Sequence, residues 1–102
     1  MQDITSKEWQ KSTAEDKNAV ILDVRTDEEV AQGMIPGAKQ IDISDPFNFM
    51  EKVRQLDNTK NYYIYCRSGG RSSQACSVLN SLGIKNTYNL IGGITAWDGP
   101  VV

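Results

Sequence analysis

The chain has 102 residues, of which 39% are hydrophobic and 24% charged, a balance typical of one soluble globular domain. We therefore expect a single domain, residues 1–102, large enough to fold around one hydrophobic core. The formal net charge of −2 excludes nucleic acid as an expected partner, and no apolar run is long enough to span a membrane.

The predicted elements alternate between apolar, β-branched runs and helical patterns. In chain order we expect a short strand at 2–4, a helix at 6–11, a strand at 19–24, a helix at 27–32, a strand at 39–43, a helix at 46–56, a strand at 62–65, a helix at 71–82, a strand at 87–90 and a short helix at 93–97. This order predicts an α/β fold with a mainly parallel central sheet of four to five strands.

Polar residues that cap helices indicate where several of these helices begin. Ser6 is the expected cap of the first helix, and Thr26 or Asp27 that of the second. Asp45 is expected to cap the third, with Pro46 at its first position.

The helix at 71–82 has the clearest apolar stripe of the predicted helices. We expect Gly83 to end it. Its core-facing stripe is expected to be Ala75, Val78, Leu79 and Leu82.

The N-terminal residues are too polar for a signal peptide, so we expect a cytoplasmic protein unless a signal peptide has been removed. Two cysteines, Cys66 and Cys76, fit a reducing compartment better than a disulfide framework. The chain has no histidine, which excludes the usual Cys–His and Ser–His catalytic pairs and the commonest metal ligand. We expect no metal and no cofactor.

Cys66 follows an expected strand and precedes a loop rich in glycine and arginine. Ligands of parallel α/β proteins bind beyond the carboxyl ends of the strands. Gly69 and Gly70 allow the backbone to curl so that its N–H groups form an anion nest. The next helix N-terminus, Arg67 and Arg71 add positive charge. We predict that Cys66 is a thiolate nucleophile with a lowered pKa, in preference to an inert structural cysteine.

The other cysteine is expected to be a small core residue. Cys76 lies in the middle of a predicted helix, beside its apolar stripe. The alternative is a resolving cysteine that forms a disulfide with Cys66, which the ten-residue separation across a helical turn does not favour.

The spacing from Cys66 to Arg71 is C-x4-R. Tyrosine-phosphatase-like enzymes use C-x5-R, in which the loop wraps a tetrahedral phosphate. The shorter loop here suits one extra sulfur atom on the cysteine better than a transferring phosphoryl group.

Three motifs resemble one known family. Residues 66–72, Cys-Arg-Ser-Gly-Gly-Arg-Ser, are similar to the active-site loop of the rhodanese sulfurtransferases. The stretch 22–38, with Leu-Asp-Val-Arg at its start and Gly-Met-Ile-Pro-Gly-Ala at its end, resembles the family's N-terminal signature. Residues 92–97, Gly-Gly-Ile-Thr-Ala-Trp, resemble its C-terminal one. The resemblance covers about the whole chain and implies the rhodanese-like three-layer fold, with helices flanking the sheet.

The resemblance also implies an activity. Cys66 would take a sulfane sulfur from a donor such as thiosulfate, carry it as a persulfide, and pass it to cyanide, a thiol or a thioredoxin-like protein. Arg71, with Arg67, would hold the sulfonate of the donor, and the loop backbone would cradle the sulfur. The substrate-binding residues expected on this basis are Arg67, Ser68, Gly69, Gly70, Arg71 and Ser72. The hydroxyls of Ser68 and Ser72 are expected either to reach the sulfur or to cap the helix.

Three further residues belong to the motif at 22–38. Met34 stands where the family usually has histidine, and we expect it to serve in packing. Asp23 and Arg25 are expected to face opposite ways, with Arg25 pairing with Glu28 or Glu29. The resemblance implies a mainly architectural role for this pair, and the alternative is that Asp23 faces the mouth of the site.

Three other functions stay open at this point. One is a phosphatase or arsenate reductase of related architecture, which the short loop disfavours. Another is a non-catalytic binding or regulatory module, which the presence of Cys66 disfavours. The third is a persulfide carrier whose acceptor is a protein, and the sequence does not separate it from a small-molecule enzyme.

Overall fold

The computed structural model describes all 102 residues and contains five strands, four α-helices and one 3₁₀ helix. Their bounds in chain order are β1 Gln2–Ile4, α1 Ser6–Glu15, β2 Ala19–Asp23, α2 Asp27–Val30, β3 Lys39–Gln40, α3 Pro46–Val53, β4 Asn61–Tyr65, α4 Gly70–Ser81, β5 Thr87–Leu90 and η1 Gly93–Ala96. None of the helices has the length and apolar character needed to cross a membrane.

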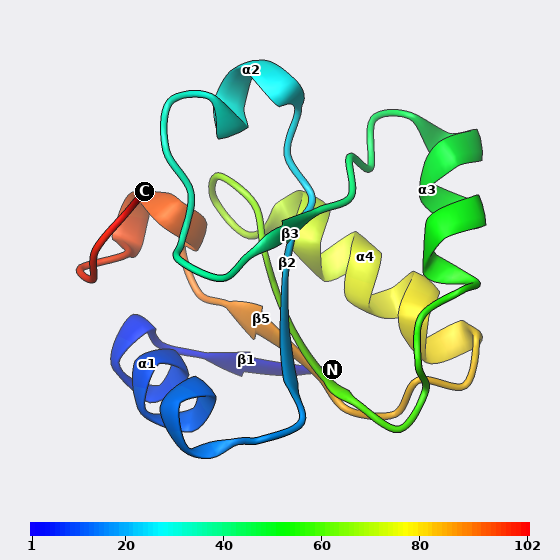
Figure 1. Cartoon of the computed structure of the whole chain (residues 1–102), viewed down its shortest axis with the longest axis horizontal. Helices are drawn as coiled ribbons and strands as arrows, with labels where there is room; N and C mark the ends of the chain where they lie inside the picture. Colours follow the sequence, from blue (N-terminus) through cyan, green and yellow to red (C-terminus); the bar gives the residue numbers. More distant parts are fainter.

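All five strands are parallel and form one sheet in the order β1-β5-β4-β2-β3 (Figure 1). β4 lies between β5 and β2, so it is paired along both of its edges. Because parallel strands end at the same edge of a sheet, the end of β4 lies beside the ends of its neighbours. The predicted α/β fold with a parallel sheet is therefore confirmed.

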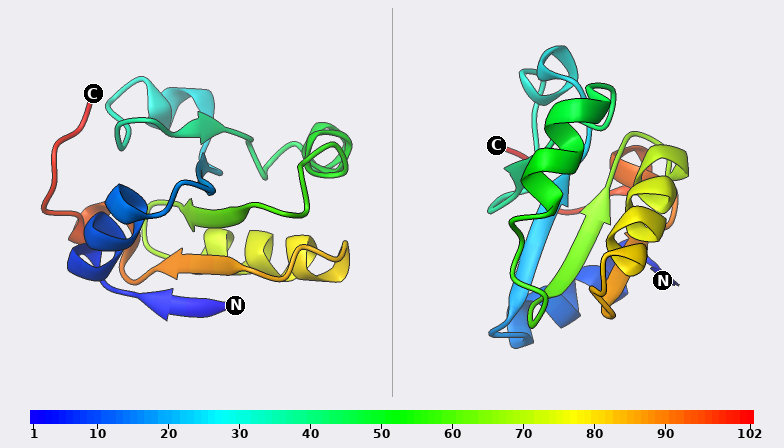
Figure 2. Two further views of the ribbon diagram at one scale, coloured as in Figure 1. Left: turned by 60° about the horizontal axis from the view of Figure 1, so that its bottom comes forward. Right: turned by 90° about the vertical axis from the view of Figure 1, so that its right-hand side faces the viewer.

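Helices cover both faces of the sheet and give the molecule three layers (Figure 2). Along β4 the side chains alternate, as the strand period of two requires. Tyr62 and Ile64 pack against α3 and α4, whereas Tyr63 and Tyr65 pack against Trp9 of α1. The residue after the strand, Cys66, continues this alternation and lies on the α3–α4 face.

Most predicted elements have different bounds in the structure, and the first helix also has a different cap. The first helix runs to Glu15, and its cap is Thr5 rather than Ser6, because Thr5 and Glu8 form a reciprocal capping box. The predicted strand at 39–43 is regular only over its first two residues. Ile41 still bonds the carbonyl of Asp23 at 2.8 Å, so the segment runs beside β2 without regular pairing.

The helix at 71–82 begins one residue earlier and ends one residue earlier than predicted. Ala75 and Leu79 of its stripe are fully buried, and Val78 packs at the margin of the core. Leu82 is exposed, which corrects its assignment to the core. It follows the last helical residue, where the chain turns toward β5 and no longer holds the helical face.

Candidate active site

Cys66 follows the last residue of β4, at the carboxyl edge of the sheet. The loop from Cys66 to Gly69 then leads directly into α4 and lies between α2 and η1 (Figure 1). Hydrogen bonds to η1 and an ion pair to α2 hold it there, as described below. The expected arrangement of strand, loop and helix around Cys66 is therefore present.

The sulfur of Cys66 is enclosed by donors of its own loop. The backbone N–H of Gly69 donates to Sγ at 3.0 Å, and the Ser72 hydroxyl oxygen lies 3.4 Å from Sγ. Only 1% of Cys66 is exposed, and burial raises the pKa of its thiol more than any other single influence. Together, the hydrogen bonds from Ser72, Gly69 and Ser68 outweigh the effect of burial and hold the pKa of Cys66 below its ordinary value.

The structure changes the prediction of which groups stabilise the Cys66 thiolate. The main groups that lower the pKa of Cys66 are backbone N–H groups and one hydroxyl at the start of α4. The two arginines were expected to share this role. Arg71 does interact with the charge of Cys66, but neither arginine is among the main causes of the lowered pKa. A helix N-terminus places unpaired N–H groups near the sulfur, which explains why short-range donors dominate.

Gly69 makes the sharp entry into α4. It is the N-cap residue, with φ of 112° in the left-handed region that L side chains rarely adopt. In this conformation its N–H points back to Cys66 Sγ while its carbonyl accepts from Ser73 N at 3.1 Å. No side chain caps this helix, so Ser72 is not a cap. It lies inside the first turn, fully buried, where its hydroxyl reaches the sulfur instead.

The motif that follows β5 holds the other side of the loop. Ile94 N donates to Cys66 O at 3.0 Å, and Thr95 N donates to Arg67 O at 3.2 Å. Gly93 has φ of 59°, and a Cβ at this position would overlap the backbone carbonyl of Arg67. Only glycine allows the two backbones to approach this closely. The segment 93–95 is therefore a clamp on the start of the Cys66 loop.

The two arginines of the loop have different surroundings. Arg71 makes a two-point ion pair with Glu29 of α2, with Nη1–Oε1 and Nη2–Oε2 distances of 2.7 and 2.9 Å. Its hydrogen bond is the main reason that the pKa of Glu29 falls to about 2. Arg67 is exposed and forms no ion pair, so it is the loop cation whose charge is free for an anionic ligand.

The structure contradicts the expected orientation and pairing of Asp23 and Arg25. The two side chains were predicted to face opposite ways, but they form a buried ion pair with Nη2–Oδ2 at 2.7 Å. β2 ends at Asp23, so strand alternation no longer governs Arg25. Arg25 also donates to the carbonyl of Gly33 at 2.7 Å, and Tyr65 donates its hydroxyl hydrogen to Asp23. Neither Glu28 nor Glu29 pairs with Arg25 through its carboxylate, and Asp23 does not face the mouth of the site.

Cys76 is a core residue, as expected. It is fully buried in the cluster that also contains Cys66, and both cysteines are free. Burial raises its pKa to about 11, so it is a neutral thiol at physiological pH.

Asn89 is a buried polar residue that the sequence analysis did not single out. Its side chain lies beside the loop, where Oδ1 accepts from the Ser72 hydroxyl and Nδ2 donates to Asp3 Oδ1 at 3.0 Å. An asparagine inside the strand at 87–90, where apolar residues are expected, is the signal that could have identified it.

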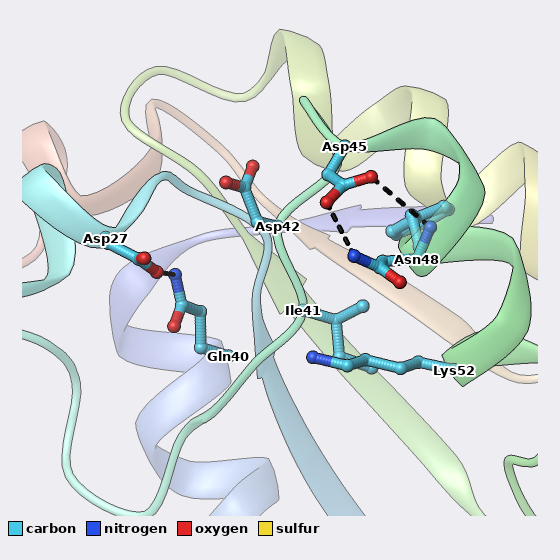
Figure 3. A pocket seen from close by; sticks show the side chains of 8 residues that line it. Asp27, Gln40, Ile41, Asp42, Asp45, Asn48 and Lys52 are labelled. Carbon is cyan, nitrogen blue, oxygen red and sulfur yellow. Dashed lines mark hydrogen bonds between the residues drawn. The ribbon is translucent and has the colours of Figure 1, made fainter.

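A polar surface cavity of about 220 Å³ lies near α2, β3 and α3, and Figure 3 shows it from close by. It contains no residue of the loop 66–72. Two of its three acids are bonded to amides, Asp27 to Gln40 at 2.9 Å and Asp45 to Asn48 at 2.7 Å. No group of three or more His, Cys, Asp or Glu side chains is arranged to hold a metal ion.

The parallel sheet, with a cysteine cradled at its carboxyl edge, defines a class of α/β proteins whose ligands bind beyond the carboxyl ends of the strands. Comparison with known proteins narrows this class, because residues 6–99 match the model of the family described as "Rhodanese-like domain". The chain belongs to the rhodanese-like family. This confirms the resemblance seen in the three sequence motifs.

Individual relatives agree with this assignment. A Bacillus subtilis protein named "Putative sulfurtransferase YtwF" is 40% identical over 97% of this chain and 92% of its own length. A protein of Allochromatium vinosum named "Sulfurtransferase" is 38% identical over 93% of this chain and 86% of its own. The crystal structure of a rhodanese-like domain protein from Staphylococcus aureus covers all of this chain and 97% of its own, with a TM-score of 0.86 and 36% identity. These names support a transferase.

Proposed function

We propose that the protein is a sulfurtransferase that moves a sulfane sulfur from a donor such as thiosulfate to a thiophilic acceptor through a persulfide on Cys66. The observation that carries this proposal is the cradle around Sγ. Donors from Gly69, Ser68 and Ser72 favour the anionic sulfur, and no histidine is present to act as a base. A thiolate that is already stabilised needs no such base.

The first half-reaction is a substitution at sulfur. The Cys66 thiolate attacks the outer sulfur of thiosulfate and forms a new S–S bond. The sulfur–sulfur bond of thiosulfate breaks, and its electron pair leaves with sulfite. Cys66 then carries a persulfide, whose terminal sulfur holds the negative charge. No external oxidant or reductant is needed for this step.

In the second half-reaction, cyanide or an acceptor thiolate attacks the terminal sulfur and takes it away as thiocyanate or as a new persulfide. The electron pair of the breaking S–S bond returns to Cys66 as the thiolate. The scheme is therefore ping-pong, with one covalent intermediate. A thioredoxin-like protein thiol is an acceptor of the required chemistry.

The cradle suits a small terminal sulfur. Because Cys66 is only 1% exposed, a donor must present its reacting atom on an unhindered end. In this proposal the N–H groups of residues 67–71 receive the transferred sulfur, and Arg67 contributes free positive charge toward the donor. Arg71 contributes less charge than its position suggests, because Glu29 neutralises it.

The test is the intact mass of the purified protein after incubation with thiosulfate. We expect a gain of one sulfur atom that disappears when cyanide is added. Cys66→Ala should abolish the gain, whereas Cys76→Ala is the matched control and should retain it. If the protein gains no sulfur from any sulfane donor, or if Cys66→Ala still gains it, the proposal fails. Loading without turnover to cyanide would identify a carrier for a protein acceptor instead.

A further inference from the structure

The Ser72 hydroxyl has more acceptors around it than it can serve. Its oxygen lies 3.4 Å from Cys66 Sγ and 3.2 Å from Gly69 O, and the amide oxygen of Asn89 is the closest of the three. A hydroxyl carries one hydrogen, so it donates to one of these acceptors at a time. Ser72 is fully buried, so water does not replace the bonds that it leaves unmade.

Two fixed acceptors set the direction in which the Asn89 amide points. Its Nδ2 lies 3.0 Å from the carboxylate of Asp3 on β1 and 3.4 Å from the carbonyl of Gly69. Carboxylate and carbonyl oxygens only accept hydrogen bonds, so the NH₂ group must face them and the amide oxygen must face Ser72. Turning the amide over would place its oxygen against two other oxygens. Asn89 therefore presents a permanent acceptor to the Ser72 hydroxyl.

We propose that Asn89 is a positioning residue that competes with the Cys66 sulfur for the single hydroxyl hydrogen of Ser72. In the neutral thiol, the S–H donates to the Ser72 oxygen, and the Ser72 hydrogen is donated to Asn89. When the thiol loses its proton to water, the Ser72 hydrogen turns to the anionic Sγ, and the Asn89 oxygen is left without it. Asn89 thereby favours the neutral thiol, and the loop donors favour the thiolate.

This competition also has a role in the proposed sulfur transfer, and on that point alone it rests on the proposed function. Once a sulfur has been added, the negative charge lies on the terminal atom and no longer on Sγ. The Asn89 amide oxygen is then a better acceptor than the uncharged Sγ, so the Ser72 hydroxyl donates to Asn89 again. The Ser72 hydroxyl therefore stabilises negative charge on Sγ only in the form without added sulfur, in which Sγ itself is the nucleophile.

Charged groups near Cys66 come from several elements. Arg71 of α4 interacts with the charge of Cys66, and Glu29 of α2 and Asp42 lie beside that arginine. Arg67 belongs to the loop, and Asp3 of β1 is linked to Ser72 through Asn89. A substitution at Asn89 changes none of these charges. A change in the pKa of Cys66 in such a variant therefore reports on hydrogen bonding.

The test is the thiol pKa of the resting protein without any sulfur donor, measured by the ultraviolet absorbance of the thiolate and by the pH profile of alkylation. Cys76 does not interfere near neutral pH, because its pKa is raised to about 11. Asn89→Leu removes the competing acceptor at similar side-chain volume. We expect it to lower the pKa of Cys66 and to speed alkylation below that pKa by about threefold or more. Ser72→Ala removes the donor and should raise the pKa.

The decisive comparison is the double variant. In the Ser72→Ala background, Asn89→Leu should no longer change the pKa of Cys66, because the hydrogen for which they compete is gone. Asp3→Ala, on the exposed edge strand, is a second probe if Asn89→Leu does not fold. Asp3→Ala releases the Asn89 amide, so it should lower the pKa of Cys66 only while Ser72 is present. The loss of the Asp3 charge adds a small effect that is the same with and without Ser72.

The proposal is overturned if Asn89→Leu leaves the pKa unchanged or raises it, or if it lowers the pKa equally with and without Ser72. If Asn89→Leu does not fold, an equal effect of Asp3→Ala in both backgrounds overturns it. Because no sulfur donor is used, a protein that fails the thiosulfate test can still pass this one.

Discussion

The carboxylate of Glu29 meets the guanidinium of Arg71 at two points, 2.7 and 2.9 Å apart. This pair joins α2 to the first turn of α4 and thereby fixes one wall of the Cys66 loop. It also cancels much of the positive charge that Arg71 would otherwise offer to an anionic donor. The same contact therefore supports the loop and limits its attraction for anions.

Releasing Arg71 should strengthen anion binding. We expect Glu29→Gln to lower the KM for thiosulfate by about threefold, because the freed guanidinium can interact with the sulfonate of the donor. Glutamine keeps an oxygen that can accept from Thr26, so the cap of α2 is retained. Steady-state kinetics at low ionic strength measure the effect. Glu28→Gln is the matched control, since Glu28 is an exposed residue of the same turn with no ion pair. An equal change in both variants would contradict this role of the pair.

The same pair predicts a specific dependence of stability on pH. Arg71, by its hydrogen bond, lowers the pKa of Glu29 from 4.5 to about 2. A carboxyl with a lower pKa in the folded state stabilises the fold above its unfolded pKa, and the stabilisation is lost as pH falls through the folded pKa. The contribution of Glu29 should therefore be complete above about pH 4.5 and should disappear toward about pH 2.

The measurement is the difference in free energy of unfolding between the wild type and Glu29→Gln, from urea denaturation across this range. We expect a difference of about 1 kcal/mol at neutral pH, since both side chains are partly exposed to solvent. It should shrink between about pH 4.5 and 2. Other carboxyl groups with lowered pKa values, such as Asp16, titrate alike in both proteins and cancel. A difference that is constant with pH would show that the pair does not act through ionisation.

The contact of Gly93 with the Cys66 loop predicts a loss of activity without a change in any reacting group. In Gly93→Ala the added methyl would overlap the carbonyl of Arg67 and lie 2.6 Å from Cys66 O, so the loop must move. We expect reduced persulfide loading together with a loss of stability. Gly83→Ala is the control, because Gly83 also has a positive φ, 90°, but has open space around it. It should lose about 1 kcal/mol of stability and keep its loading rate. Equal loading in both variants would argue against the clamp.

Periodicity and turn residues were enough to predict the order and type of the elements. β5 has the predicted bounds, and Asp45 caps α3 with Pro46 at its first position, because these signals are local. The errors have two causes. Thr5 replaced Ser6 as a cap through Glu8, which is a local capping-box pattern that was missed. The strand at 39–43 lost its regular pairing after two residues, which depends on its contact with β2.

The candidate site could be predicted in part. The position of Cys66 and its loop follows from the chain itself, because the strand, the glycines and the helix are contiguous. Partners from elsewhere in the chain could not be predicted. Glu29 reaches Arg71 across 42 residues, and Asn89 reaches Ser72 across 17. Such pairs depend on strand order and on the angle at which a helix leaves the sheet, which a single sequence does not specify.

The Tyr65 hydroxyl provides a test on the opposite face of the sheet. It accepts from the backbone N–H of Ile35 at 3.0 Å and donates to Asp23, and all three groups are buried. Tyr65→Phe leaves the Ile35 N–H without a partner and removes one donor to Asp23, whose ion pair with Arg25 remains. We expect a loss of about 2 kcal/mol in the free energy of unfolding.

Tyr63→Phe is the matched control for this variant, because Tyr63 lies on the same strand and face but makes a single bond, at 3.2 Å, to the partly exposed Asp16. It should lose about 1 kcal/mol or less. Both rings pack against Trp9, so both substitutions keep the aromatic contacts. Cys66 faces the other side of the sheet, and its alkylation rate should not change in either variant. A slowed reaction of Cys66 in Tyr65→Phe would instead show that the buried Asp23–Arg25 pair influences the loop through the sheet.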